Sequence, residues 1–224
     1  MAQTHTNLGF ALLSMKRDPE EQYRKAIGYS PTFIPAYTGL GEVLEAKGKM
    51  DDARNVLTKA TMIHPFDAGV YMNLGVMLQH AKENEDALKV LKIAAQLSPQ
   101  DGVIHDNMGV TLVALDKKEL LEEARASFKT AVRLSPTRGS AHAGLGVVSQ
   151  TIGGEMKQAC LHFIRAAQLN PEAYMQIGKQ AAGWLKKNAG QAADSRGTAP
   201  GAQSQQEKVH VILTLRICPD CRYH

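Results

Sequence analysis

The chain has 224 residues, of which 44% are hydrophobic and 21% are charged, which is ordinary for a soluble globular protein. Its net charge of +4 is mild and its basic residues form no stripe, so we expect no nucleic acid partner. No apolar run approaches the ~20 residues that cross a bilayer, the first residues do not resemble a signal peptide, and three cysteines make no disulfide framework. We therefore expect a cytoplasmic protein that does not bind membranes.

One sequence pattern recurs from the first residues onward. Residues 32–65 and 66–99 match with no gap, and residues 3–31 form a shorter copy with a clipped first helix. The shorter copy lacks two residues near Asp18 and Pro19, where we expect a turn. A fixed period of 34 residues is typical of a stacked repeat protein. The matching residues are Tyr37 and Tyr71, Leu40 and Leu74, Gly41 and Gly75, Leu44 and Leu78, Ala53 and Ala87, Leu57 and Leu91, Ala60 and Ala94, and Pro65 and Pro99.

Two more copies and a half-copy follow. Residues 100–136 contain three additional residues, and residues 137–171 contain one. Both insertions fall where we expect the turn between two helices, and turns tolerate changes of length better than helices do. The half-copy at 172–188 predicts a single helix that caps the array.

Each copy predicts two helices. In residues 32–65, Tyr37, Leu40 and Leu44 share one face of a helix with 3.6 residues per turn. Gly48 then predicts the end of that helix, because glycine adopts the left-handed conformation easily. Glycine inside a helix costs ~1 kcal/mol relative to alanine, so a recurring one indicates that two helices approach closely. The recurring glycines are Gly41, Gly75, Gly109 and Gly146.

This pattern resembles the tetratricopeptide repeat family. The 34-residue period, the aromatic residue before Leu-Gly, the two spaced alanines and the closing proline are marks of that family across residues 3–188. His105 and His142 replace the aromatic residue, and we expect them to pack in its place. The resemblance implies an all-α, right-handed superhelical solenoid of about five helix-turn-helix repeats plus a C-terminal capping helix. In such a solenoid, neighbouring repeats bury the apolar faces that one repeat cannot bury alone.

In the family that the chain resembles, the first helices of the repeats line a concave groove. The groove holds an extended peptide or a helix of a partner protein. The resemblance therefore implies a set of groove-lining positions in this chain. They are Asn7, Thr38, Glu42, Glu45, Met72, Asn73, Val76, Gln79, His80, Asp106, Asn107, Val110, Val113, Ala143, Val147 and Gln150.

Three of these residues, Asn7, Asn73 and Asn107, occupy the same place in different copies. A carboxamide donates and accepts hydrogen bonds, so a ladder of them can hold a peptide main chain. Similar ladders occur in the repeats of the protein O-linked N-acetylglucosamine transferase. Gly39 and Gly144 interrupt the ladder in this chain. The alternative is that each asparagine only bonds the backbone of the neighbouring repeat.

The residues of the predicted groove restrict its ligand. Family members that hold a C-terminal carboxylate use basic residues at positions that are here Thr38, Glu42, Met72 and Val76. The groove is instead acidic at its start and apolar in its middle, so we expect a ligand with basic and apolar side chains. His80 would face the same groove and could make a pH-sensitive contact there.

The composition changes after the repeats. Residues 189–208 are small and polar and predict a disordered linker, and residues 209–224 form a short apolar tail. Cys218, Cys221 and His224 supply three metal ligands at most, whereas a structural zinc site needs four. We therefore treat them as weak metal candidates and expect neither a metal nor a cofactor.

The sequence favours binding over catalysis. It shows no Ser-His-Asp order, no phosphate-binding glycine loop and no catalytic pair of carboxylates, so we expect that the chain is not an enzyme. The main hypothesis is a non-catalytic scaffold at residues 1–188 that binds a protein or peptide ligand. The alternative is the recruiting or regulatory portion of a larger enzyme, such as an O-linked glycosyltransferase.

Overall fold

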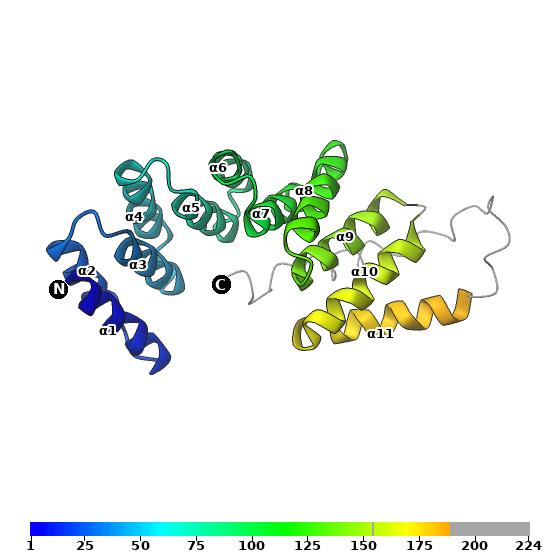
Figure 1. The fold of residues 1–224 in the computed structure, drawn as a ribbon, viewed down its shortest axis with the longest axis horizontal. Helices are drawn as coiled ribbons and strands as arrows, with labels where there is room; N and C mark the ends of the chain where they lie inside the picture. The colour runs from blue at the N-terminus through cyan, green and yellow to red at the C-terminus, as the bar shows by residue number, and fades with distance from the viewer. Residues whose placement is uncertain (154, 189–224) are drawn as a thin grey trace. The chain divides into compact units, whose positions relative to one another are not determined.

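A computed structural model describes residues 1–153 and 155–188 as helices joined by short turns (Figure 1). The chain divides into two compact units, the first at residues 1–99 and the second from residue 100 onward, and each is described by itself. The predicted linker and the predicted tail, with Cys218, Cys221 and His224, lie outside the described residues.

The first unit consists of three helical hairpins. The two helices of each hairpin pack together, and the second helices of the first two hairpins also contact the first helix of the next hairpin. The first helices of successive hairpins contact one another as well. The helices are α1 (Ala2–Ser14), α2 (Glu20–Tyr29), α3 (Ile34–Ala46), α4 (Met50–Ile63), α5 (Ala68–His80) and α6 (Asn84–Leu97).

The described part of the second unit consists of two hairpins and a last helix. A short 3₁₀ helix, η1 (Lys118–Leu120), lies in the turn of its first hairpin and accommodates the three additional residues of the fourth copy. The last helix packs against the second helix of the second hairpin. The α-helices are α7 (Gly102–Ala114), α8 (Leu121–Leu134), α9 (Gly139–Ile152), α10 (Met156–Leu169) and α11 (Pro171–Asn188).

All regular structure in residues 1–153 and 155–188 is helical, so the predicted all-α fold of paired helices is confirmed. Large apolar side chains on the second helices form the core with the first helices. In the first unit one buried cluster joins Tyr23, Leu40, Leu57 and Leu74 from four different helices. Because each cluster draws on neighbouring hairpins, no hairpin buries its apolar face alone.

The turns between the two helices of the five hairpins share one backbone feature. The seventh residue after the recurring glycine has a positive φ in each, although it is glycine in only two. The prediction that Gly48 ends a helix is confirmed, since α3 ends at Ala46 and Gly48 has a φ of 75°. The equivalent residues are Lys16, Gly48, Lys82, Asp116 and Gly153.

Two expectations for the first copy are wrong. The helix α1 is not clipped, because it has 13 residues, as α3 does. The turn is not shortened either, since it spans residues 15–19, and the missing length is taken from α2, which has 10 residues against 14 in α4. Pro19 lies directly before α2, and a proline has no N–H to continue a helix upstream.

Candidate protein-interaction face

The residues predicted to line a groove lie on the first helices of the hairpins. In the first unit, Thr38, Glu42 and Glu45 are spaced four and three residues apart, which places them on one side of α3. In the second unit, Val110 and Val113 have a similar spacing on α7. We call the surface formed by the predicted residues of a unit its first-helix face.

The first-helix face of the first unit contains a link between α3 and α5. The Nδ1 atom of His80 lies 2.5 Å from the Oε1 atom of Glu45, and both side chains are partly buried. The hydroxyl of Thr38 donates to the carbonyl of Pro35 over 3.2 Å. Glu42 is exposed. Of the two predicted carboxylates, therefore, Glu45 is engaged by a histidine of the next repeat, and Glu42 is the more accessible.

The helix α5 presents a mixed surface on this face. Met72, Asn73, Val76 and Gln79 are all partly exposed, in contrast to their buried neighbours Leu74, Gly75, Met77 and Leu78. Because α3 contacts α5, these aliphatic and amide side chains lie on a helix next to the one that carries Glu42. This arrangement combines a negative charge, hydrogen-bonding groups and apolar surface.

One residue of this face was not predicted from the sequence. Phe10 on α1 occupies the place of Glu42 and Val76, one residue after the recurring glycine. Its side chain is 47% exposed and its ring meets Tyr23 edge-on, with centroids 5.8 Å apart. Counting positions from Gly9 would have identified it. On the same helix Asn7 is exposed, and its Oδ1 atom accepts a 2.7 Å hydrogen bond from Gln3.

The first-helix face of the second unit is mostly enclosed. Asp106 is fully buried. Its Oδ2 atom accepts one hydrogen bond from the Ser140 hydroxyl and another, over 3.4 Å, from Arg138. Both donors lie at the start of α9. Burial raises the pKa of this carboxyl, although these two donors oppose the rise. The Asp106 side chain thus joins α7 to α9.

The remaining predicted residues of the second unit differ in exposure. Asn107 is buried, and its main-chain carbonyl accepts a 2.7 Å hydrogen bond from the hydroxyl of Thr111. Val113, Ala143 and Val147 are buried, whereas Val110 and Gln150 are partly exposed. From the sequence, these side chains were expected to line a groove, with a bond to the neighbouring repeat as the alternative for Asn107, and the close enclosure of α9 was not predicted.

The interruptions of the asparagine ladder have a steric cause. A Cβ atom at Gly39 would lie 2.6 Å from the ring of Tyr23, and one at Gly144 would overlap the ring of Phe128. Each of these rings belongs to the second helix of the preceding repeat. In the following copy, where that second-helix position is Leu57, the ladder position is Asn73. Glycine therefore stands at the ladder position where a large ring fills the space that a side chain would need.

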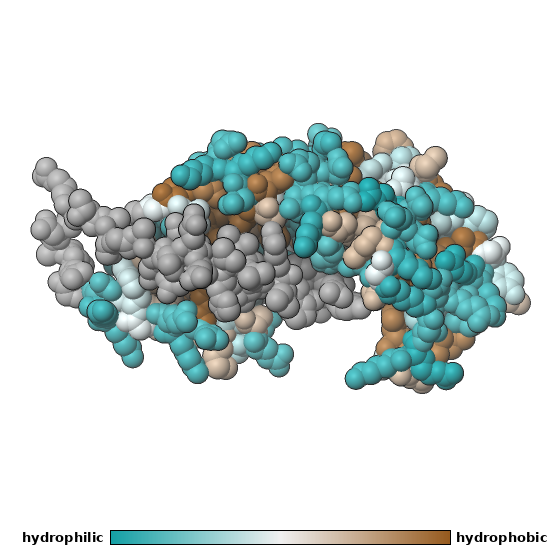
Figure 2. Space-filling model, turned by 180° about the vertical axis from the view of Figure 1, so that it is seen from behind, coloured by the Kyte–Doolittle hydropathy of each residue, from teal (hydrophilic) through white to brown (hydrophobic). Residues whose placement is uncertain are grey.

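Polar side chains cover much of the described surface in the view of Figure 2, with hydrophobic patches between them. Met62, in the last turn of α4, and Phe66, between α4 and α5, are among the most exposed hydrophobic residues. No helix within the described residues is both long and apolar enough to span a membrane.

The comparisons with known proteins agree with this repeat architecture. A family model described as tetratricopeptide repeat matches residues 38–102. A search of curated protein sequences finds no significant match to the chain.

Solved structures resemble the fold over most of the chain. YrrB, described as a TPR protein with an unusual peptide-binding site, is 22% identical, with a TM-score of 0.57 over 84% of this chain and 92% of its own. TTC0263, a thermophilic TPR protein of Thermus thermophilus, is 21% identical, with a TM-score of 0.63 over 83% of this chain and 100% of its own. Yeast Tom70 is 20% identical, with a TM-score of 0.70 over 85% of this chain and 40% of its own.

These likenesses, at identities under 25%, concern the fold. A match to the tetratricopeptide repeat family covers residues 38–102, and the five described helical hairpins, which share one phase of glycines, alanines and left-handed turns, have the fold of tetratricopeptide repeat proteins.

Proposed function

We propose that this repeat scaffold is non-catalytic and binds a peptide or helix of a partner protein on its first-helix faces. The tetratricopeptide fold is that of a protein-interaction module, which supports a protein partner in general terms. YrrB, whose fold is similar, is itself described as having a peptide-binding site.

The observation that carries the proposal is the mixed surface of the first unit. Phe10, Glu42 and Val76 occupy one equivalent position in three consecutive first helices, and all three are at least partly exposed. An aromatic ring, a carboxylate and an aliphatic side chain in series match a ligand segment that carries a basic residue between apolar ones. Asn73, next to this series, offers both a donor and an acceptor to the ligand main chain.

A peptide array tests the ligand class directly. The full chain would be applied to peptides that contain one lysine or arginine flanked by leucine or valine, and to matched peptides with glutamate in place of the basic residue. We expect the basic set to bind more tightly. The affinity of the best peptide is then measured by fluorescence anisotropy for the chain and its variants.

Two substitutions on the first-helix face of the first unit should weaken the binding of that peptide. Glu42→Lys reverses the exposed charge, and we expect about a tenfold loss of affinity, which corresponds to ~1.4 kcal/mol. Val76→Asp places a charge at the apolar contact and should cost at least as much. Far-UV circular dichroism checks that both variants fold.

Glu21→Lys is the matched control. It makes the same change of charge on α2, a second helix of the first unit, where Glu21 is exposed and pairs with Lys25. The control should bind the peptide as the parent chain does. Equal affinity for the parent, Glu42→Lys and Val76→Asp would contradict the proposal.

A further inference from the structure

Two histidines face each other inside the last hairpin of the second unit. His142 lies on α9 and His162 on α10, and their Nδ1 atoms are 3.4 Å apart. The ring centroids are 5.6 Å apart and the rings are tilted by 34°. A separation of 3.4 Å is longer than the 2.7–3.2 Å that is typical of an N–H hydrogen bond in proteins, so a direct bond between the rings is poor.

The second hairpin of the first unit shows what these positions usually hold. There, Tyr37 and Val56 occupy the places of His142 and His162, and they belong to one apolar cluster. In the last hairpin, imidazole side chains therefore replace both residues of this apolar contact. The residues between positions 142 and 162 otherwise keep the pattern, with Gly146 packed against Phe163 as Gly41 is against Leu57.

The second ring nitrogen of His142 is already engaged. Its Nε2 atom lies 3.2 Å from the carbonyl oxygen of Pro136, and the hydroxyl of Tyr37 donates to the carbonyl of Pro31 in the same way, over 2.8 Å. A carbonyl only accepts, so Nε2 carries the proton and Nδ1 presents a lone pair toward His162. Metal-binding histidines usually donate the N–H of their other ring nitrogen to a carboxylate, a backbone carbonyl or water, and this hydrogen bond fixes the tautomer.

We propose that His142 and His162 bind a divalent transition metal ion, such as Zn²⁺ or Cu²⁺, through their Nδ1 atoms. Imidazole nitrogens bind Zn²⁺ at about 2.0–2.1 Å, and at a tetrahedral angle two such nitrogens lie roughly 3.3–3.4 Å apart. The observed separation of 3.4 Å agrees with this value before any movement of the side chains. Imidazole is also a ligand that suits zinc and copper.

The surroundings of the pair define what kind of site this is. No group of three or more metal-ligating side chains occurs among residues 1–153 and 155–188, so the site has two ligands from this part of the chain and water at its other positions. Lys129 and Arg165 are near the pair, and a cation would be repelled by them. We therefore expect affinity in the micromolar range, and not the tight binding of a structural zinc site.

Metal titration of the full chain tests the site. Because Cys218 and Cys221 could bind metal independently, every protein carries Cys218→Ser and Cys221→Ser. Zn²⁺ affinity is measured by competition with a metal-sensitive dye, and Co²⁺ is added in parallel to record its visible absorption. His162→Val reproduces the residue of the second hairpin, so it should fold, and we expect at least a tenfold loss of Zn²⁺ affinity and loss of the Co²⁺ absorption.

Two further variants decide the interpretation. His142→Tyr also reproduces the second hairpin and should lose the metal as His162→Val does. His64→Gln removes an exposed histidine of the first unit and should leave Zn²⁺ affinity unchanged. Unchanged affinity in His162→Val, or a parent chain that binds no Zn²⁺, would overturn the proposal and leave the two rings as a packing pair.

Discussion

The first two repeats pack together in the same way as the last two full repeats. We call the interface between the first two the first joint, in the first unit, and the interface between the last two the second joint, in the second unit. In the first joint the ring of Tyr23 lies against Gly9 of its own repeat and Gly39 of the next. Added Cβ atoms there would lie 2.7 Å and 2.6 Å from the ring. A buried aromatic residue on a second helix thus requires two glycines on two first helices.

The second joint repeats this packing with different residues. Phe128 lies against Gly109 of its own repeat and Gly144 of the next, and it is fully buried, as Tyr23 is. A hydrogen bond to the last proline carbonyl of the preceding repeat is common to both joints as well. Tyr37 makes it in the first and His142 in the second.

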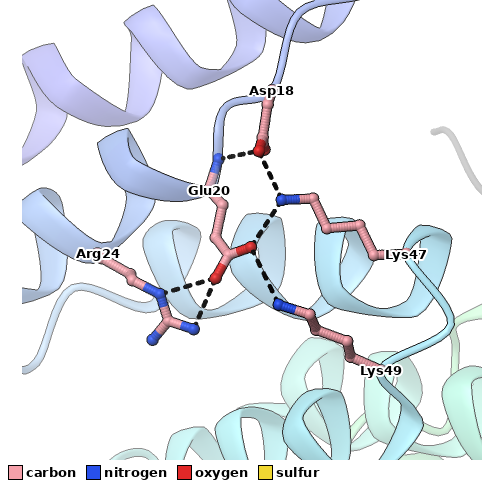
Figure 3. A network of polar contacts seen from close by, with 5 residues as sticks. All are labelled: Asp18, Glu20, Arg24, Lys47 and Lys49. Atoms are coloured by element: carbon pink, nitrogen blue, oxygen red, sulfur yellow. Dashed lines mark hydrogen bonds and ion pairs between the residues drawn. The ribbon is translucent and has the colours of Figure 1, made fainter.

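The charges at the two joints have opposite orientation. In the first, Glu20 on α2 pairs with Lys47 and Lys49 in the next turn and with Arg24 on its own helix (Figure 3). In the second, Arg125 on α8 occupies the place of Glu20 and pairs with Glu155, 3.1 Å away, in the place of Lys49. Close packing is therefore the same in both joints, whereas the polarity of the ion pair is exchanged.

The largest expected effect comes from filling the close contact of the second joint. Gly144→Ala would place a methyl group in the ring of Phe128, and overpacking of this kind typically costs about 1–3 kcal/mol of unfolding free energy. The loss should exceed the gain in helix propensity, which is ~1 kcal/mol. Urea denaturation followed by circular dichroism measures it.

A second substitution links that loss to the ring. Phe128→Leu shortens the side chain, so the double variant should be more stable than the sum of the two single losses predicts. Gly183→Ala on α11 is the control, because an added Cβ there meets nothing within 4 Å, and it should stabilise the chain slightly. Strict additivity in the double variant would show that the contact with Phe128 is not the cause.

An intermediate effect should follow from reversing the ion pair of the second joint. Arg125 is largely buried, and Arg125→Glu would place its carboxylate beside Glu155 and Glu122. We expect a loss of roughly 1–2 kcal/mol, as for a charged hydrogen bond that is broken. Arg125→Glu with Glu155→Lys reproduces the polarity of the first joint and should recover most of the loss. A double variant as unstable as Arg125→Glu would show that polarity is fixed at this joint.

The local part of this packing could be predicted from the sequence. The period of 34 residues placed Leu40, Gly41 and Gly48 correctly, because helix faces and helix ends depend on residues close in the chain. It also identified glycines that allow close approach. The partner of each glycine was not predicted, since Gly144 meets a ring of the preceding repeat.

In the candidate site, too, the positions of residues along a helix could be predicted, whereas their contacts with other helices could not. The resemblance to the family implied that Glu45 and His80 lie on one face, but it did not show that they bond to each other across 35 residues of sequence. Asp106 was expected to face a ligand and instead joins α7 to α9. His162 and Phe10 were not singled out, since each matters through a partner on another helix. Non-local pairs of side chains, and not helix positions, are what the sequence alone left undetermined.

The smallest expected effect concerns the first joint and depends on pH. Hydrogen bonds from Lys47 are the main cause of the lowered pKa values of Asp18 and Glu20. A carboxyl with a lowered pKa in the folded state stabilises the fold above its unfolded pKa, which is about 4, and loses this contribution as the pH falls through its folded value. Lys47→Met should therefore be slightly less stable than the parent chain at pH 7, and the difference should shrink below about pH 4.

Salt provides an independent check of this last prediction. Because Lys47 and Asp18 are exposed to solvent, 1 M NaCl should also reduce the difference in unfolding free energy between the parent chain and Lys47→Met. Lys25→Met is the matched control, since Lys25 pairs with Glu21 within one helix and spans no joint. If both variants lose the same stability with the same dependence on pH, the network at the first joint adds nothing beyond an ordinary helix pair. A larger and more acid-sensitive loss in Lys47→Met would show that ion pairs hold the first joint, as close packing does.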